Sequence, residues 1–161
     1  MTSAFDPGEP IGYAEGGEWL DAYVVARTTF SGDAFVDLFS PDAVLMPDPF
    51  MSPLTGSNAI RAYLGSVADS VTGCELEFER HWVSGATLLA AWHGSFVRRV
   101  DGRLVREAGF MTAEFRSGRC ERARIWTVTG DDRTPGVDPT RRYEGEYGAR
   151  LTRSDGRLDG R

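Results

Sequence analysis

Residues 38–64 read LFSPDAVLMPDPFMSPLTGSNAIRAYL, and this stretch sets the order of the elements around it. Residues 43–46 predict a short strand, and three prolines follow it. Because proline lacks a backbone N–H donor, the proline-containing segment is not a central strand. A helix is then expected to begin with Ser57 as its cap. Its apolar stripe consists of Ile60, Tyr63, Leu64 and Val67.

Upstream of this stretch, apolar residues recur at helical spacing and predict a first amphipathic helix of about 14 residues. Ser31-Gly32-Asp33 then predicts a break and a new helix start. A short second helix is expected to carry Phe35, Leu38 and Phe39. The stripe of the first helix consists of Trp19, Leu20, Tyr23, Val24 and Phe30.

Downstream, the apolar period changes to two, which predicts four strands over 75–83, 87–98, 103–116 and 119–128. Their connections contain Ser-Gly, Asp-Gly and Ser-Gly, and short glycine turns favour antiparallel hairpins. Helices followed by a meander predict an α+β domain, in which a curved sheet carries its helices on one face.

The composition excludes several chemistries. The 161 residues contain no lysine, which excludes a Schiff-base lysine and a phosphate-loop lysine. A net charge of -6 argues against nucleic acid and anionic membranes as partners. With only two cysteines and two histidines, and none at motif spacing, we expect no metal site and no cofactor.

We expect one folded domain over residues 15–129, between an N-terminal extension (1–14) and a polar Gly/Arg-rich tail (130–161). The tail is expected either to be flexible or to lie over a folded body through Tyr143, Tyr147 and Leu151. No apolar run is long enough to span a bilayer, and the first residues do not resemble a secretory signal. These features favour a cytoplasmic protein with unpaired cysteines.

The predicted order of elements, and the "DA", "DP" and "AI" pairs within residues 38–64, resemble the nuclear transport factor 2-like superfamily. Within it, the chain is most similar to the group of SnoaL-like polyketide cyclases and ketosteroid isomerases. The resemblance implies a cone-shaped α+β fold, with three N-terminal helices packed on a curved, mainly antiparallel sheet. It also implies that Asp48 occupies the position of the proton-shuttling carboxylate and Tyr23 that of the oxyanion-binding tyrosine. The group's protonated carboxyl falls on Met111, so steroid isomerisation itself does not follow.

A two-residue loop at Asp101-Gly102 would pair Trp92 with Met111 and Gly94 with Gly109. The two glycines would either leave open space or mark a bend of the sheet. Apolar residues on the opposite face predict a homodimer through the sheet. The face expected to line a cavity, by the resemblance, carries Trp92, Gly94, Phe96, Glu107, Gly109 and Met111.

Three side chains are the first candidates for acid/base chemistry, and each has a structural alternative. Asp48 lies among apolar residues, where it could act as a general base, or it is a turn acceptor before Pro49. Tyr23 could donate to an oxyanion, or it is a core aromatic of the first helix. Glu107 is the carboxylate on the expected cavity face of the central hairpin, or it faces solvent.

Glu75, Glu77, Glu79 and His81 alternate with Leu76, Phe78, Arg80 and Trp82, and the apolar set is expected to face the helices. Glu75, at the start of the strand, could still reach the mouth of the cavity. Polyether epoxide-opening cyclases of this fold use an aspartate and a glutamate in similar places, which here would be Asp48 and Glu75. His93 is expected on a dimer face or in the core.

These features predict a cofactor-free acid/base enzyme that isomerises or cyclises a small, apolar, polyketide-like or steroid-like carbonyl compound, with Asp48 as the base. One alternative is an epoxide hydrolase or epoxide-opening cyclase that uses Asp48 with Glu75 or Glu107. The other is a non-catalytic domain for ligand binding or dimerisation. The expected substrate pocket consists of Trp19, Phe50, Tyr63, Trp92, Phe96, Met111 and Trp126.

Overall fold

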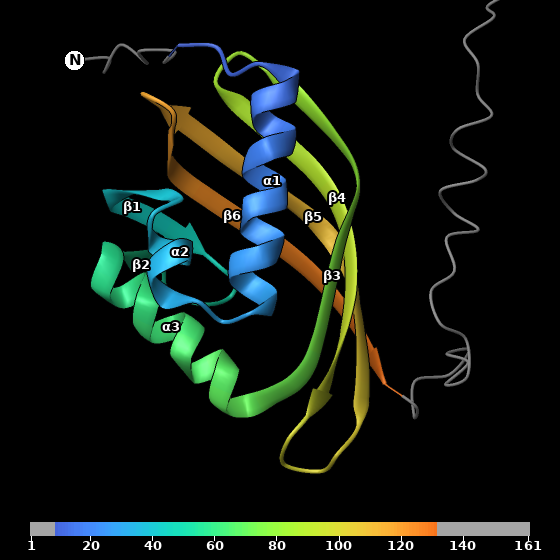
Figure 1. Cartoon of the computed structure of the whole chain (residues 1–161). Helices are drawn as coiled ribbons and strands as arrows, with labels where there is room; N and C mark the ends of the chain where they lie inside the picture. The colour runs from blue at the N-terminus through green and yellow to red at the C-terminus, as the bar shows by residue number, and fades with distance from the viewer. Residues whose placement is uncertain (1–8, 132–161) are drawn as a thin grey trace, which may run out of the picture.

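A computed structural model describes residues 9–131, which form three helices and one six-stranded sheet (Figure 1). The predicted α+β architecture is confirmed. The N-terminal residues 1–8 and the tail from residue 132 lie outside the described residues, as do Tyr143, Tyr147 and Leu151. The helices are α1 (Tyr13–Thr28), α2 (Gly32–Val36) and α3 (Ser57–Ser70). The strands are β1 (Phe39–Met46), β2 (Leu54–Thr55), β3 (Val71–Ser84), β4 (Thr87–Arg98), β5 (Leu104–Arg116) and β6 (Arg119–Asp131).

The sheet has the strand order β2-β1-β6-β5-β4-β3. The four long strands form the predicted antiparallel meander. The short strand β1 pairs in parallel with the last strand, so that Leu45 lies opposite Ala123. The pairing of β1 with β6 extends the sheet beyond the meander and joins the N-terminal half of the chain to its last strand.

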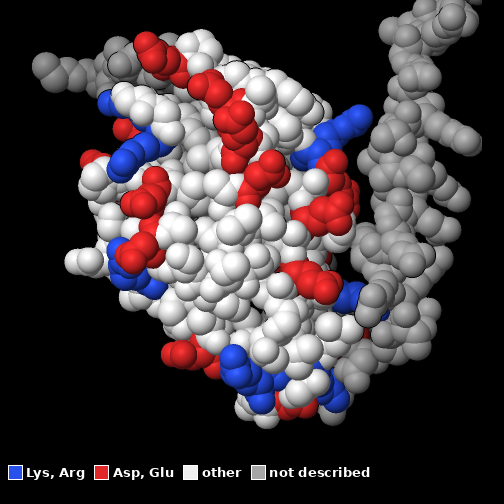
Figure 2. Space-filling view, in the orientation of Figure 1, with Lys and Arg blue, Asp and Glu red and all other residues white. Residues whose placement is uncertain are grey.

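Helix α1 lies across the inner face of the curved sheet, as Figure 1 shows. Its buried side consists of Gly16, Trp19, Leu20, Tyr23 and Ala26, spaced three or four residues apart. A Cβ at Gly16 would lie 3.1 Å from Leu88, so this glycine lets the helix approach β4 closely. The exposed side of α1 carries acidic residues, and Figure 2 shows acidic side chains along this part of the surface.

The core between the helices and the sheet is built largely from aromatic rings. Trp19 packs edge-on against Phe115, with ring centroids 5.3 Å apart, and Tyr23 packs against Phe35 at 5.3 Å. The indole Nε1 of Trp19 donates a hydrogen bond of 3.1 Å to the carbonyl of Leu38. Each buried ring contributes roughly 1.5–3 kcal/mol through the hydrophobic effect, so this cluster anchors α1 and α2.

The structure corrects two helix boundaries. Helix α2 ends at Val36, and Phe39 already belongs to β1, because the chain must extend there to pair with Cys120. Gly56, with φ of 83°, is the cap of α3, and Ser57 is its first residue. The predicted start of α2 is confirmed, since the hydroxyl of Ser31 accepts a hydrogen bond from the N–H of Ala34.

The predicted register between β4 and β5 was wrong by two residues. Trp92 lies opposite Gly109, and Gly94 lies opposite Glu107. The connection is longer than two residues, because Arg98 and Arg103 are the last hydrogen-bonded pair and the Gly102 N–H donates back to the Arg98 carbonyl at 2.8 Å. A shift of two residues leaves every side chain on its predicted face.

The two glycines of this hairpin mark close contacts with neighbouring strands. A Cβ at Gly94 would lie 2.4 Å from the carbonyl oxygen of Glu75, and one at Gly109 would lie 1.8 Å from that of Trp126. No side chain fits at either position. The open-space interpretation is therefore wrong, because the backbone of a neighbouring strand lies where each Cβ would be.

A β-bulge between Phe78 and Arg80 divides β3 into two halves. Before the bulge, Leu76 and Phe78 face the helices as predicted. After it the pattern reverses, so Trp82 is 43% exposed on the outer face. His81 instead stacks on the ring of Tyr13 in α1, with centroids 4.0 Å apart. The prediction for the second half of this strand was thus wrong.

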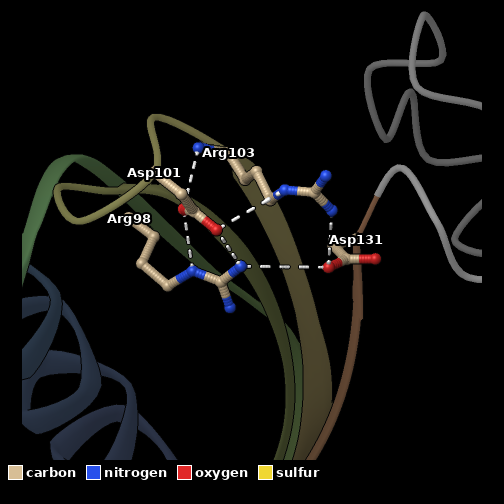
Figure 3. A network of polar contacts seen from close by, with 4 residues as sticks. All are labelled: Arg98, Asp101, Arg103 and Asp131. Atoms are coloured by element: carbon tan, nitrogen blue, oxygen red, sulfur yellow. Dashed lines mark hydrogen bonds and ion pairs between the residues drawn. The ribbon is translucent and has the colours of Figure 1, made fainter.

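The end of the β4–β5 hairpin carries a cluster of two arginines and two aspartates (Figure 3). Asp101 accepts hydrogen bonds from Arg98 at 3.0 Å and 2.6 Å, and it also contacts Arg103. Asp131 at the end of β6 lies 3.4 Å from the same Arg103. The hydrogen bonds from Arg98 lower the pKa of Asp101 to about 2. The cluster ties the hairpin to the last strand.

Candidate active site

A cavity of about 320 Å³ lies between the sheet, the end of α1, the middle of α3 and the loop after β1. Sites for small molecules have volumes of roughly 300–1,000 Å³, so this cavity suits a small ligand. Its lining combines apolar, phenolic and ionisable side chains. The lining residues are Tyr23, Arg27, Pro47, Asp48, Met51, Tyr63, Cys74, Glu75, Leu76, Phe78, Trp92, Glu107, Met111, Ile125, Thr127 and Thr129.

Helix α1 contributes Tyr23 and, one turn later, Arg27. Tyr23 is 5% exposed, and its burial raises the pKa of the phenol, an effect that nearby Arg27 reduces. Tyr63 reaches the cavity from α3. Burial raises the pKa of Tyr63 most, Arg27 opposes this, and Glu107 and Asp48 raise it further. Both phenols therefore keep their protons at neutral pH and can donate hydrogen bonds.

Asp48 follows β1, and its side chain is the turn acceptor that one of the two interpretations predicted. It lines the cavity, and its Oδ1 accepts a hydrogen bond of 2.7 Å from the N–H of Phe50. The carbonyl of Asp48 also accepts from Met51 at 3.1 Å, which closes the turn. This turn holds the carboxylate against the loop, and one oxygen of the carboxylate stays available for other contacts.

Glu107 lines the cavity from β5, on the same face as Met111 and four residues before it. Burial raises the pKa of its carboxyl, and Arg27 reduces that rise. A carboxyl in this environment holds its proton to a higher pH than a solvated one does. Thr129 lies opposite Glu107 in the sheet and also lines the cavity.

Sequence reasoning missed Arg27 and Cys74. Arg27 follows the apolar stripe of α1 and resembles an ordinary basic residue at a helix end. In the structure its guanidinium lines the cavity and lies 3.8 Å from the Sγ of Cys74. The four-residue spacing from Tyr23 was the available signal, because residues i and i+4 share a helix face.

The other predicted site residues separate into two groups. Glu75, Tyr63, Trp92 and Met111 line the cavity, although the carboxylate of Glu75 accepts a hydrogen bond of 3.4 Å from Ser95 on the outer face. Four predicted pocket residues do not line it. Trp19 is buried in the core, Phe50 is 97% exposed, Phe96 is half-buried beyond the cavity, and Trp126 is 41% exposed on the outer face.

The outer face of the sheet holds a cluster of exposed aromatic rings. Phe110 and Trp126 are paired across β5 and β6, and Trp82 lies on β3 of the same face. Phe110 is 51% exposed. His93 belongs to this face, where its Nδ1 lies 2.9 Å from the carboxylate of Glu79. The dimer was predicted from the apolar residues of β4 and β5 on this face, and of the three exposed rings only Phe110 was among them.

Residues 9–131 contain no group of three His, Cys, Asp or Glu side chains arranged to hold a metal ion. Among these residues, no helix is both long enough and apolar enough to cross a bilayer.

The chain is an α+β domain in which three helices pack on one face of a curved sheet, with a small cavity between the helices and the sheet. The chain belongs to the SnoaL-like domain family, whose sequence profile matches residues 18–123. This family is part of the nuclear transport factor 2-like superfamily that the sequence resembles. A comparison with curated proteins found no match.

Solved structures of similar fold share low identity with this chain. A candidate aromatic ring hydroxylase from Novosphingobium aromaticivorans is 23% identical, with 75% of this chain and 95% of that chain covered and a TM-score of 0.66. The epoxide hydrolase/cyclase-like enzyme SalBIII, which has a role in pyran ring formation in salinomycin, is 16% identical, with coverages of 73% and 96% and a TM-score of 0.66. An epoxide hydrolase of M. tuberculosis is 18% identical, with coverages of 71% and 84% and a TM-score of 0.61. These similarities show the shared fold.

Proposed function

We propose that this protein is an enzyme that uses general acid/base catalysis to isomerise or cyclise a small, largely apolar carbonyl compound. The observation that carries the proposal is the convergence of Asp48, Glu107 and two protonated phenols on one cavity of about 320 Å³. Two carboxyl groups in different environments can take different roles, one as base and one as acid.

Asp48 acts as the base in this proposal. It is held by the turn to Phe50 and can remove a proton from a carbon next to the substrate carbonyl. The apolar part of the substrate packs against Leu76, Phe78 and Met111, which exclude water from the reacting atoms. The proton can return to another carbon, which is isomerisation, or the carbanion can attack a second carbonyl, which is cyclisation.

Glu107 and the phenols stabilise the oxyanion that this step creates. The resemblance implies that Met111 takes the position of the neutral carboxylic acid of the ketosteroid isomerases. In this proposal Glu107 supplies the carboxyl instead, from the same face of the same strand. Burial raises the pKa of its carboxyl, and in the protonated form this carboxyl can donate to the oxyanion together with Tyr23.

A second candidate is the opening of an epoxide by the same residues. The raised pKa of Glu107 favours it as the acid that protonates the epoxide oxygen, while Asp48 activates water or an internal hydroxyl. The folds of two proteins described as epoxide hydrolases or cyclases support this alternative.

Turnover of a compound panel by the wild-type protein and by Asp48→Asn tests both candidates. The panel contains small ketones with an acidic α-proton, diketones and epoxides. We expect turnover within one of these groups, with a loss of about 10²–10⁴-fold in Asp48→Asn. Turnover that survives Asp48→Asn excludes Asp48 as the base, and binding without any turnover favours a non-catalytic ligand-binding domain.

A further inference from the structure

Among the described residues that line the cavity, Arg27 is the one basic side chain, and within residues 9–131 it forms no ion pair. Within residues 9–131 its recorded contacts are a hydrogen bond to the Cys74 thiol at 3.8 Å and a stacking contact with Phe30 at 5.5 Å. No carboxylate of these residues lies within ion-pair distance of its guanidinium. A guanidinium has five N–H donors, and a thiol is a weak acceptor, so most of these donors are available.

The field of Arg27 extends across the cavity. The same cation lowers the pKa values of Tyr23, Tyr63, Cys74 and Glu107, all of which burial raises. These groups come from α1, α3, β3 and β5. An anion bound by Arg27 would therefore enter the electrostatic environment that these four groups share.

Trp92 adds a second donor without an acceptor. It lines the cavity and is 7% exposed, and its Nε1 is buried without a hydrogen-bond partner in the described part of the chain. Buried indole N–H groups are normally paired, because an unpaired one has lost its bond to water. Among the described residues, two side chains that line this cavity therefore carry donors without an acceptor. The Trp92 Nε1 has almost no accessible surface, so Arg27 is the donor that a ligand with acceptor oxygens can reach.

We propose that the natural substrate is a small organic carboxylate and that Arg27 binds its carboxylate group. A planar guanidinium matches a carboxylate through two parallel N–H···O bonds. The carboxylate of Asp48 makes the cavity less favourable for a doubly charged group such as a phosphate than for a singly charged carboxylate. The proposal rests on the proposed function, because it treats the same cavity as the place of reaction. Arg27 is then a specificity residue, and the carbonyl or epoxide lies between it and Asp48.

Arg27 also lies in the last turn of α1, where a cation interacts favourably with the helix dipole. That interaction explains an arginine at this position without a ligand. The two explanations can be separated by experiment. If Arg27 binds anions, the cavity favours a negatively charged small molecule over a neutral one of the same size. The interaction with the helix dipole predicts no such preference.

Cys74 provides a probe for this difference. Iodoacetate and iodoacetamide are nearly equal in size, and only iodoacetate carries a carboxylate. With either reagent the Cys74 thiolate attacks the methylene carbon, an S–C bond forms, and iodide leaves with its bonding electrons. The other cysteine, Cys120, is buried, and burial raises its pKa to about 12, so it reacts slowly in the folded protein.

The experiment measures both alkylation rates at Cys74 by peptide mass spectrometry, in the folded protein and in urea. We expect the ratio of the iodoacetate rate to the iodoacetamide rate to be about tenfold higher in the folded protein than in the unfolded chain. Arg27→Met should abolish this preference, and Arg27→Lys should keep part of it. Arg124→Met is the matched control, because Arg124 is an exposed arginine of the outer face.

Equal ratios in the folded and the unfolded wild-type protein overturn the proposal without any variant. A raised ratio that survives Arg27→Met overturns the assignment to Arg27. Asp48→Asn separates this proposal from the proposed function: it should remove turnover and leave the alkylation ratio high. If Asp48→Asn keeps full turnover while the preference depends on Arg27, the anion site stands and the catalytic role of Asp48 does not.

Discussion

The carboxylate of Asp48 accepts a hydrogen bond of 2.7 Å from the backbone N–H of Phe50, and the same residue lines the cavity. The turn and the candidate base are thus one structural unit. An asparagine keeps the acceptor oxygen and loses the basicity, whereas an alanine loses both. The two functions of Asp48 can therefore be tested separately.

For Asp48→Asn we predict a free energy of unfolding within about 0.5 kcal/mol of the wild-type value, because the bond to Phe50 persists. Asp48→Ala should lower it by about 0.5–1.5 kcal/mol, the contribution of one hydrogen bond. Urea denaturation of the three proteins measures both differences. A large loss of stability in Asp48→Asn would show that the carboxylate mainly stabilises the folded structure and would contradict its assignment as a catalytic base.

For Glu107→Gln we predict a small loss of turnover if the reaction is isomerisation or cyclisation, because the amide can still donate a hydrogen bond to the oxyanion. If the reaction is epoxide opening, the loss should be about 10²–10³-fold, because the amide cannot protonate the epoxide oxygen. Burial raises the pKa of Glu107 in the folded protein above its unfolded value of 4.5. The group therefore favours folding at low pH, and this contribution is lost as the pH rises through the folded pKa. Glu107→Gln should melt at a higher temperature than the wild type at pH 7 and at an equal temperature near pH 4. If Glu107→Gln melts at a lower temperature than the wild type at pH 7, then burial of the charged Glu107 carboxylate does not destabilise the wild-type protein.

For Gly109→Ala we predict a loss of at least about 2 kcal/mol, because the new Cβ would lie 1.8 Å from the Trp126 carbonyl oxygen. Gly65→Ala in α3 is the matched control, since no atom lies within 4 Å of its Cβ position. That change should be neutral or stabilise the protein by up to about 1 kcal/mol. Equal stability of the two variants in urea would mean that β5 and β6 are farther apart than described.

Asp101→Asn should weaken the hairpin cluster in a pH-dependent way. Hydrogen bonds from Arg98 lower the pKa of Asp101 from 3.8 to about 2. The cluster therefore stabilises the fold above about pH 4, and this contribution is lost as the pH falls through about 2. Denaturation midpoints of the wild type and the variant should differ at pH 7 and converge near pH 2. Because Asp101 is exposed, the difference should be small and should decrease in high salt.

We predict that the exposed rings of Phe110, Trp126 and Trp82 form the contact of a homodimer. Phe110→Glu should place a charge in that contact and shift the protein to a monomer in sedimentation velocity experiments. Val25→Glu is the control, because Val25 is 61% exposed on α1, away from this face. A wild-type monomer at high concentration, or a dimer that survives Phe110→Glu, would contradict the prediction.

The faces of the central hairpin could be predicted from sequence even though its register could not. Side chains alternate with a period of two, so the error of two residues left Trp92, Glu107 and Met111 on one face. The register depends on the length of the connection, and the Asp101-Gly102 pair alone does not distinguish a two-residue loop from the longer connection between Arg98 and Arg103. The bulge after Phe78 did change the predicted faces of β3. One extra residue in the strand moves every later side chain to the other face of the sheet.

The sequence by itself determined the elements and the central candidates of the site. Helical and strand periods, glycine turns and prolines act locally, so they predicted three helices and a meander. The family resemblance then pointed to Asp48 and Tyr23, and the strand alternation put Glu107 on the face that the resemblance assigned to the cavity. Only the tertiary structure decided which side chains meet. The parallel pairing of β1 with β6 joins distant segments, and it brings the loop of Asp48 to the sheet opposite Arg27. Arg27 became a candidate only there, because the environment of a charge depends on atoms far away along the chain.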